Sequence, residues 1–355
     1  MENDRRPLHD RVRARPALEL PSGPQGFRWR TLRDTDAPLL TVLAERMSVR
    51  DHPSWSESLE EVEDQLGRSW FRPATDGVLC EGPDGAPVAY GTVTMPPDPE
   101  SLVRVFLGGG VDPVHRSRGI GRELLAWQHE RARQLLASSP STLPAWVMSH
   151  AADLAPEHGA LLRRQGFEAA RYFTTLECEV ARHANQAAPP APEGVTITPF
   201  TAELSERVRR AKNSAFVDHW GSQPAGVEQW ESMVGLSSFR PDLSRIALVD
   251  DEVVGFVTTE VNEDDWERQG FSSGYIGLVG TVRPWRRRGL ASALLGAVLE
   301  AYSLAVDEDR GSRRSRRAEA DRRCAATPRR ASRYTPARRS GPGGSGRVRA
   351  GRAEG

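Results

Sequence analysis

Cysteine, lysine and long apolar runs are scarce in this chain of 355 residues. The three cysteines, Cys80, Cys178 and Cys324, are scattered with no Cys-x-x-Cys pair. The sequence therefore supports neither a disulfide framework nor a zinc site, and we expect no metal. No stretch of roughly 18 apolar residues occurs, which argues against a membrane span, and the first residues lack the apolar region of a secretory signal. These absences predict a cytoplasmic protein without a membrane partner.

Acidic and basic residues balance over the whole chain, with 48 of each, but they are unevenly spread. From Arg310 onward there are fifteen arginines and three carboxylates, a local net charge of +12, so the rest of the chain carries −12. This end has almost no large apolar residue besides Tyr334 and Val348. It cannot bury enough surface to offset the entropy of ordering, so we expect residues 310–355 to be a disordered basic tail.

The most informative stretch is Arg116-x-x-Gly119-x-Gly121, which follows an apolar run with strand character and precedes a helical pattern. At a strand-to-helix junction the first helical N–H groups have no partner, and the helix dipole adds partial positive charge. Glycines let the backbone approach a ligand closely. The stretch therefore predicts a cradle for a diphosphate, with Arg118 and Arg122 adding charge.

A glycine-rich turn alone is weak evidence, because dinucleotide-binding folds and P-loops use the same physics. Neither of these two signatures is found at this turn. For one copy taken alone, a capped turn that binds no ligand remains an alternative. A second copy, Arg286-x-x-Gly289-x-Ala291, again follows a strand-like run and precedes an apolar helix. A repeat of this length indicates a duplicated domain.

At these residues the sequence resembles the GNAT acyltransferase superfamily, whose motif Gln/Arg-x-x-Gly-x-Gly/Ala holds the pyrophosphate of acetyl-CoA. The chain looks like the bacterial tandem-GNAT proteins over residues 27–309, and residues 211–222 look like a subfamily marker. The resemblance implies an α/β fold, with a mixed central sheet in each of two tandem domains. The expected parts are a flexible lead-in (1–25), a complete first domain (26–183), a Pro/Ala linker (184–194), a second domain lacking its closing helix and strands (195–309), and the basic tail (310–355).

The resemblance also implies acetyl-CoA as the acyl donor, held by each turn and by the strand before it. In the first domain the expected contacts are Gly109, Val111, Arg116, Ser117, Arg118, Gly119, Ile120, Gly121 and Arg122. In the second domain they are Val279, Thr281, Arg286, Arg287, Arg288, Gly289, Leu290 and Ala291. Three glycines at residues 108–110 give the strand end room for the pantetheine arm; a glycine bulge at a sheet edge is an equal alternative.

Residues for proton transfer are not evident. Family members often carry a carboxylate on the strand before the cradle, and neither copy has one. The tyrosine of the family's Leu-Tyr-x-x-x-Gly-Phe segment is Leu162 in the first domain. The catalytic residues stay unassigned, with Tyr172, Asp218 and His219 as candidates. Packing explains Tyr172 more simply, and a capped helix end explains the other two equally well.

We expect an N-acetyltransferase that moves an acetyl group to the amine of a small molecule or peptide. A catalytically inactive acyl-CoA sensor is the alternative within the family. Nucleic-acid binding through the basic tail and through Trp285 with its neighbouring arginines is a third hypothesis. CoA phosphates explain those arginines, so we expect no nucleic-acid partner.

The end of the second domain is unusual. The pattern predicts a fifth strand at residues 303–307, and nothing after it resembles a closing helix and strands. Composition changes there to Arg, Ala, Gly, Ser and Pro, so we hypothesise that residues 310–355 arise from a shifted reading frame or a truncation. A domain ending in this way would expose an unpaired sheet edge. We therefore expect activity to lie in the first domain.

Overall fold

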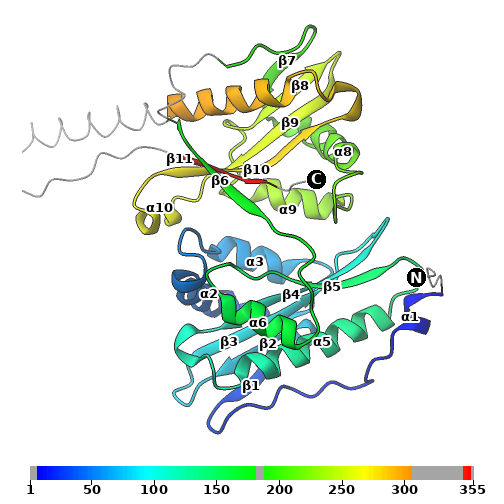
Figure 1. The fold of residues 1–355 in the computed structure, drawn as a ribbon, viewed down its shortest axis with the longest axis vertical. Coiled ribbons are helices and arrows are strands. Elements are labelled where there is room, and N and C mark those ends of the chain that lie inside the picture. Colours follow the sequence, from blue (N-terminus) through cyan, green and yellow to red (C-terminus); the bar gives the residue numbers. More distant parts are fainter. Residues whose placement is uncertain (1–5, 181–187, 306–346, 353–355) are drawn as a thin grey trace, which may run out of the picture. The chain divides into compact units, whose positions relative to one another are not determined.

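The computed structural model describes residues 6–180, 188–305 and 347–352, which form two compact units (Figure 1). The first unit contains the chain up to Tyr172 together with Phe216–Ser237, and the second contains Phe173–Ala215 and the residues from Ser238 onward. Within the described ranges, no helix is long and apolar enough to cross a membrane. The same ranges hold no cluster of three or more His, Cys, Asp or Glu side chains suited to a metal.

The first unit is built on a sheet with strand order β1-β2-β3-β4-β5. Its strands are β1 (Arg28–Thr31), β2 (Gly77–Glu81), β3 (Pro87–Thr94), β4 (Val103–Val111) and β5 (Ala145–Ser149). Neighbours pair antiparallel except β4 and β5, which are parallel. The parallel pairing ends where Leu107 faces Ser149, so residues 108–111 extend beyond β5. One edge of β4 is therefore open just before the first glycine-rich turn.

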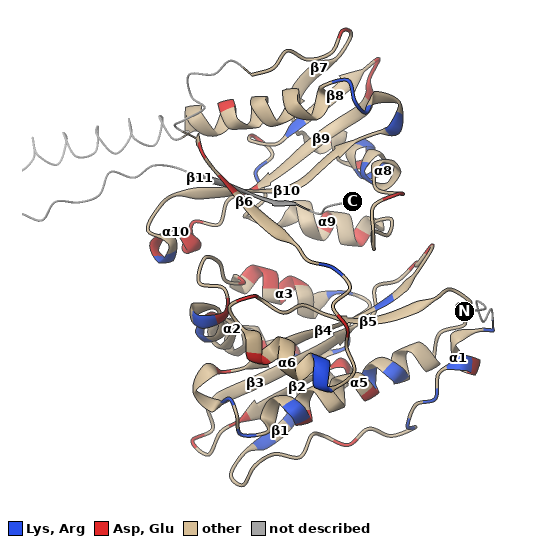
Figure 2. Ribbon diagram, in the orientation of Figure 1, with Lys and Arg blue, Asp and Glu red and all other residues tan. Residues whose placement is uncertain are grey.

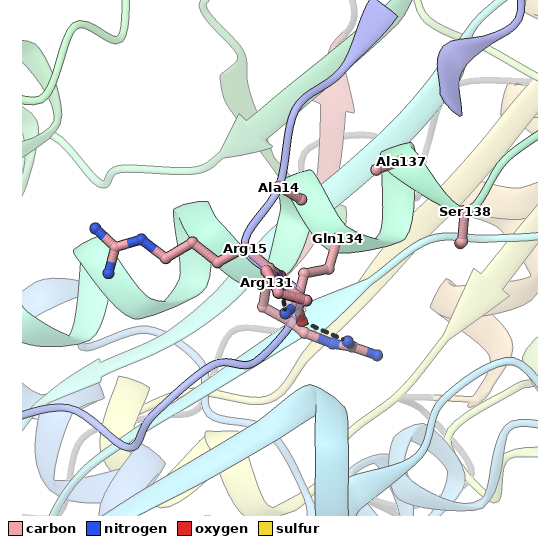
Figure 3. Close-up of a pocket in the computed structure, with 7 residues that line it drawn as sticks. Ala14, Arg15, Arg131, Gln134, Ala137 and Ser138 are labelled. Atoms are coloured by element: carbon pink, nitrogen blue, oxygen red, sulfur yellow. Dashed lines mark hydrogen bonds between the residues drawn. The ribbon is translucent and has the colours of Figure 1, made fainter. Parts of the chain in front are cut away.

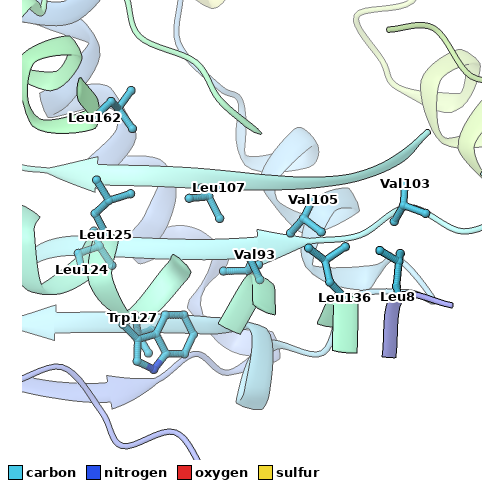
Figure 4. Close-up of a cluster of buried hydrophobic side chains, with 12 residues drawn as sticks. Leu8, Val93, Val103, Val105, Leu107, Leu124, Leu125, Trp127, Leu136 and Leu162 are labelled. Carbon is cyan, nitrogen blue, oxygen red and sulfur yellow. The ribbon is translucent and has the colours of Figure 1, made fainter. Parts of the chain in front are cut away.

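Helices cover this sheet and supply its core. They are α1 (Leu8–Arg11), α2 (Ala37–Asp51), α3 (Leu59–Gly67), α4 (Pro73–Asp76), α5 (Ile120–Ala137) and α6 (Pro156–Arg164), with short 3-10 turns at η1 (Asp34–Asp36) and η2 (Pro113–His115). Leu124, Leu125 and Leu136 of α5 pack on Val105 and Leu107 of β4, as Figure 4 shows. This packing fixes the direction of α5, and so the position of the turn that starts it.

The segment before β1 is packed, not a flexible lead-in, over its described residues. Leu8 is buried in the core beside α5, and its amide donates to Ser141 O at 2.8 Å. Further along, Arg133 donates to the carbonyl of Arg13 at 2.7 Å. Sequence patterning missed this because a few scattered apolar residues, Leu8, Val12 and Leu18, create no periodic signal.

A segment of the second half of the sequence also belongs to the first unit. It carries α9 (Val227–Gly235). Ser232 Oγ of this helix donates to Asp64 of α3 at 2.7 Å, and Glu228 accepts from the amide and hydroxyl of Ser69 at 2.8 and 2.6 Å. These polar contacts place α9 against α3.

The second unit repeats the first sheet and extends it. Its strand order in the described residues is β6-β11-β10-β9-β8-β7. The bounds are β6 (Thr174–Glu179), β7 (Thr196–Pro199), β8 (Arg245–Val249), β9 (Glu252–Glu260), β10 (Ser273–Thr281) and β11 (Arg347–Arg352). β7 to β10 are antiparallel in the same order as β1 to β4, and β11 lies parallel to β10, as β5 does to β4.

The helices of the second unit follow the same plan. They are η3 (Ala202–Leu204), α8 (Ser205–Ala215), α10 (Asp264–Gln269), η4 (Arg283–Trp285) and a helix at residues 290–305. Leu290, Leu294 and Val298 of the last helix pack on Ile276 and Val257 of the sheet. The duplication predicted from the two glycine-rich motifs is therefore present in three dimensions.

Three features of the second unit differ from the sequence predictions. Residues 303–305 continue the helix, so the strand expected at 303–307 is wrong over those residues. Residues 172–180 alternate between polar and apolar side chains, which predicts a last strand of the first domain. They form β6 instead, which pairs with β11 in the second sheet. β11 itself comes from the tail expected to be disordered; residues 310–346 of that tail lie outside the described residues.

The physical reason is the open edge of β10. A strand edge presents unpaired N–H and C=O groups that any extended segment can satisfy, whatever its side chains. β11 pairs with residues 273–276 of β10, and β6 pairs with the far side of β11. The unpaired edge expected at β10 is therefore covered over that range. The described residues hold no closing helix for this unit.

Candidate acyl-CoA site

The first glycine-rich turn has the geometry expected of an anion cradle. Val111 ends β4, η2 follows, and Gly119 with φ of 89° is the left-handed N-cap of α5. Ser117 also has a positive φ, 63°. Within the described part of the chain, the amides of residues 117–121 have no hydrogen-bond partner. Five consecutive donors at a helix start can bind a diphosphate.

The second turn repeats this backbone closely. Arg287 has φ of 60° and Gly289 has φ of 81°, the same left-handed positions as in the first turn. The amides of residues 287–291 likewise have no partner among the described residues. Two separate stretches of sequence thus adopt one local structure, which supports a common ligand class for both.

The first arginine of the first motif braces the turn. Arg116 Nε donates to the carbonyl of Val111 at 3.0 Å, and its two terminal nitrogens donate to the carboxylate of Asp51 at 2.8 and 2.6 Å. Glu157 of α6 accepts from it as well, at 3.0 Å. Burial opposes the charge, yet the hydrogen bonds to Asp51 and Glu157 raise the pKa of Arg116 above its usual value. Its charge is largely neutralised within the protein.

The equivalent arginine of the second motif is held in the same way. Arg286 Nε donates to the carbonyl of Thr281, the last residue of β10, at 3.1 Å. Its terminal nitrogen donates to the carbonyl of Ala215, the last residue of α8, at 2.7 Å. In both units this arginine ties the end of the central strand to the end of the first long helix. It therefore shapes the turn more than it supplies charge.

Other arginines around the turns are exposed; Figure 2 colours the Lys and Arg positions of the ribbon blue. Arg118 and Arg122 are exposed in the first unit, and Arg287 and Arg288 in the second. Arg288 also stacks over the ring of Trp285, with its guanidinium carbon 4.8 Å from the ring centroid. These exposed side chains can supply charge to phosphate groups outside the backbone cradle, and Arg122 also pairs with Glu123 at 3.2 Å.

The strand leading to each turn has amides that face its open edge. Asp112 N donates to β3 and Val282 N donates to β9, at 2.8 and 3.0 Å. Because neighbouring residues of a strand direct their N–H groups to opposite edges, the amides of Val111 and Thr281, and of Val279 two residues earlier, face away from those strands. The parallel partner has already ended there. Thr281 Oγ1 is also buried with no hydrogen-bond partner within the described chain. This edge fits an amide-bearing arm such as pantetheine.

Gly109 approaches its neighbour too closely for any side chain. A Cβ at this position would lie 2.3 Å from Tyr90 O, and φ is 91°. The pairing of β3 with β4 shows no register shift, so the alternative of a bulge at these glycines is wrong. The second unit carries the bulge instead, between Ile276 and Leu278 of β10.

The expected catalytic candidates are not gathered at the first turn. Tyr172 is 79% exposed, where the chain leaves the first unit. The loop containing Asp218 and His219 is anchored near the start of β4, where Arg104 donates to Gly221 O at 2.7 Å. Val111 lies seven residues further along this strand, roughly 23 Å away. The structure therefore does not bring Tyr172, Asp218 and His219 together at the first turn.

A hollow along α5 is also distant from the first turn. It has a volume of about 340 Å³ and is drawn in Figure 3. Its lining residues are Ala14, Arg15, Pro16, Arg131, Gln134, Ala137 and Ser138. Arg131 is already paired with Asp76 at 2.7 Å. Arg131 lies about 18 Å along the helix from Gly119, so we assign no role in acyl transfer to this hollow.

Sequence reasoning missed several charged residues near the turns. Asp51, Glu157 and His158 cluster around Arg116, and burial lowers the pKa of His158 below its usual value. Glu260 lies over β10 from the neighbouring strand. The family motif points to a carboxylate only on the strand before each turn. Cross-strand register in the β9–β10 hairpin is the signal that points to Glu260.

Comparison with known proteins finds one family model that matches part of the chain. A model described as the acetyltransferase (GNAT) family matches residues 205–306, which contain α8, β10 and the second turn. This segment is similar to that family, and the first unit repeats its arrangement of sheet, turn and helix.

Individual proteins are also similar to this chain. A mycothiol acetyltransferase from Frankia casuarinae is 30% identical over 212 residues, covering 56% of this chain and 59% of that protein. The match thus spans about six tenths of that relative's length. A GCN5-related N-acetyltransferase from Sphaerobacter thermophilus has a TM-score of 0.58 at 22% identity, covering 93% of this chain and 87% of that one. A tandem GNAT protein from the clavulanic acid biosynthesis pathway also has a TM-score of 0.58, at 16% identity, covering 92% and 90%. The last two show the shared fold.

Proposed function

We propose that the protein is an acetyl-CoA-dependent N-acetyltransferase that acts on the amine of a small molecule or peptide. The observation that carries this proposal is the turn at residues 287–291, which follows the open edge of β10 and has five amides without a hydrogen-bond partner among the described residues. The turn lies within the segment matched by the acetyltransferase family. The mycothiol acetyltransferase relative supports a small-molecule acceptor.

The chain's own residues supply positioning and polarisation. Acetyl-CoA would supply an activated acetyl group as a thioester. The amides of residues 287–291 and the exposed Arg287 and Arg288 would hold its diphosphate. The amides of Val279 and Thr281 would orient the arm along β10 and polarise the thioester carbonyl. Holding donor and acceptor in one geometry supplies much of the rate by itself.

We place the transfer site in the second unit. The earlier expectation of activity in the first unit depended on a second sheet with an unpaired edge. β11 and β6 extend that sheet, and the family match falls on this half of the chain. The first unit keeps an equivalent turn, so it retains the means to bind acyl-CoA.

The test is release of the CoA thiol by the full chain with acetyl-CoA and a panel of small amines. Amine-dependent thiol release supports the proposal. Tight acetyl-CoA binding without thiol release for any amine would instead support the inactive sensor. Nucleic-acid binding depends on residues 310–355, most of which lie outside the described residues, so no observation favours it.

A further inference from the structure

Acetylation of an amine needs a group that accepts a proton from the attacking nitrogen. β10, the strand along which the acyl group would lie, offers one titratable side chain, Tyr275, and no carboxylate. A proton acceptor at this strand must therefore come from another element. β9 pairs antiparallel with β10, so its side chains share the faces of that strand.

Glu260, the last residue of β9, places its carboxylate over β10. A Cβ built on Gly277 would lie 2.6 Å from Glu260 Oε1 and 3.3 Å from Thr258 Oγ1. The carboxylate therefore occupies the space that a side chain at Gly277 would fill. Glycine at this position leaves that space open to the carboxylate.

The backbone at Gly277 is irregular in two ways. The pairing of β10 with β9 shifts register between Ile276 and Leu278, and Leu278 N donates to Thr258 Oγ1 at 3.0 Å instead of to a backbone carbonyl. The pairing of β10 with β11 ends at Ile276. Glu260 thus lies where β10 bulges and its outer edge becomes open, a place where bulges commonly re-aim groups in active sites.

The position also fits the order of groups along the strand. From Gly277 the open-edge amides of Val279 and Thr281 follow, and the turn at residues 287–291 comes next. The distance from Gly277 to Thr281 is about 13 Å in an extended strand. A ligand anchored by its diphosphate at the turn and running back along this edge would bring its acyl end to Gly277 and Glu260.

Glu260 lies on the sheet face away from the helix at residues 290–305. Ile276 packs on Leu290 and Leu294 of that helix. Its neighbour Tyr275, which pairs with Glu260, lies on the opposite face. Glu260 is partly exposed there. An acceptor can therefore reach it from solvent without displacing the core.

We propose that Glu260 accepts the proton of the acceptor amine in the second unit; this inference rests on the proposed acetyl transfer. The carboxylate takes one proton from the ammonium form of the acceptor and so frees the lone pair of its nitrogen, which then forms its bond to the acetyl carbon and releases its second proton to solvent. The carbon–sulfur bond breaks, its electron pair leaves with the thiolate, and the thiolate takes a proton from solvent. Glu260 then returns its proton to solvent.

The other polar groups near Glu260 are either paired elsewhere or unsuited to accept a proton. Arg240 is paired with Asp242 at 2.6 Å. Burial raises the pKa of Tyr302, so this phenol stays protonated, and its hydroxyl donates to the carbonyl of Glu260 at 3.4 Å. Glu263 lies three residues on, in the loop before α10. Glu260 is the carboxylate of this group that covers the bulge of β10.

The test compares full-length wild type with Glu260→Gln, Glu260→Asp and the control Glu267→Gln, which alters an exposed carboxylate on α10. Steady-state kinetics are measured with a strongly basic amine and with a weakly basic amine that is already neutral at the assay pH. Acetyl-CoA affinity is measured by calorimetry on each variant. We expect Glu260→Gln to lower kcat for the strongly basic amine about 100-fold or more. The KM for acetyl-CoA should stay unchanged, the weakly basic amine should lose far less, and Glu260→Asp should recover part of the rate.

Equal loss for both amines, or a kcat for Glu260→Gln within about 3-fold of the Glu267→Gln control, would overturn the role of Glu260. Those outcomes leave the proposed function standing, because wild type still transfers acetyl groups. Failure of wild type to bind acetyl-CoA, or to release thiol with any amine, overturns the function and the inference together.

Discussion

At the residue scale, Gly119 and Gly289 are the positions where the proposed diphosphate sites are most sensitive. Both have left-handed backbone and lie among the unpartnered amides. Aspartate at either position adds strain and a negative charge where an anion would bind. We expect Gly289→Asp to weaken acetyl-CoA binding to the second unit by about 1.5–3 kcal/mol, which is roughly 10- to 150-fold.

Calorimetric titration checks this prediction against a matched control. Gly270→Asp has the same backbone demand, with φ of 77°, at the end of α10. It should cost stability but not affinity. Equal weakening by both substitutions would show that strain, not charge at the turn, caused the loss.

Asp36 makes a separate prediction about acid stability. Its side chain is buried, and it accepts from Arg30 at 2.7 and 2.9 Å and from the Arg33 amide at 2.8 Å. Burial alone would raise its pKa, but these hydrogen bonds lower the pKa below 3.8. The stabilisation is therefore present above the unfolded-state pKa of about 3.9 and is lost as the pH falls through the lower folded-state value.

We expect Asp36→Asn to reduce the free energy of unfolding by about 1–3 kcal/mol at pH 7. Its difference from wild type should shrink as the pH drops below about 3.9. Urea denaturation at a series of pH values measures this. A deficit independent of pH would contradict the role assigned to the ionised carboxylate.

The sequence is most informative at this residue scale. The left-handed backbone of Gly119 and Gly289 could be predicted, because an Arg-x-x-Gly-x-Gly/Ala turn between a strand and a helix favours this conformation at its first glycine. The structure shows it in both turns. The brace of Arg116 to Asp51 could not be predicted, since the two are 65 residues apart. The placement of Glu260 over Gly277 required the strand register, which neither residue reveals alone.

At the scale of elements, the arginine brace joins a strand, a turn and a helix in each unit. In the first unit Arg116 makes a bidentate contact with Asp51 that lysine cannot reproduce. We expect Arg116→Lys to lower the stability of the first unit by about 1.5–3 kcal/mol. Arg118→Lys, at an exposed neighbour, should change it by less than about 0.5 kcal/mol. Urea denaturation followed by tryptophan fluorescence compares the two, and equal stabilities would refute the brace.

The position of β6 tests the extended second sheet. Thr175 and Leu176 are adjacent, exposed residues of this strand, and adjacent residues direct their N–H groups to opposite edges. Proline removes the N–H group, so only one of Thr175→Pro and Leu176→Pro should break a hydrogen bond to β11. That variant should lose about 1–3 kcal/mol of stability. Amide hydrogen exchange of β6 measures it, and equal protection in both variants would contradict the pairing.

Strand periodicity predicted β6 as an element but not its partner. An alternating run shows that a segment is extended, while the choice of sheet depends on which edge is open. β11 was missed for a related reason: arginine and glycine dominate it, and its described structure consists of backbone pairing with β10 and β6. Sequence composition does not report an edge that needs covering.

At the scale of the whole molecule, the duplication leaves two similar turns and one proposed transfer site. Both turns have open amides and adjacent surface arginines. In β10 the carboxylate of Glu260 lies over the bulge at Gly277. In β4 the corresponding glycine-rich stretch has Gly109 close against Tyr90 O. The proposal therefore assigns transfer to the second unit and leaves binding alone to the first.

The most direct measurement of this assignment is amine-dependent thiol release from acetyl-CoA by the full chain, compared between Gly119→Asp and Gly289→Asp. Both substitutions replace the glycine at the same place of the two turns. The account predicts that Gly119→Asp keeps kcat near the wild-type value, whereas Gly289→Asp loses kcat/KM for acetyl-CoA by roughly 10-fold or more. Loss of activity in Gly119→Asp with full activity in Gly289→Asp would contradict it.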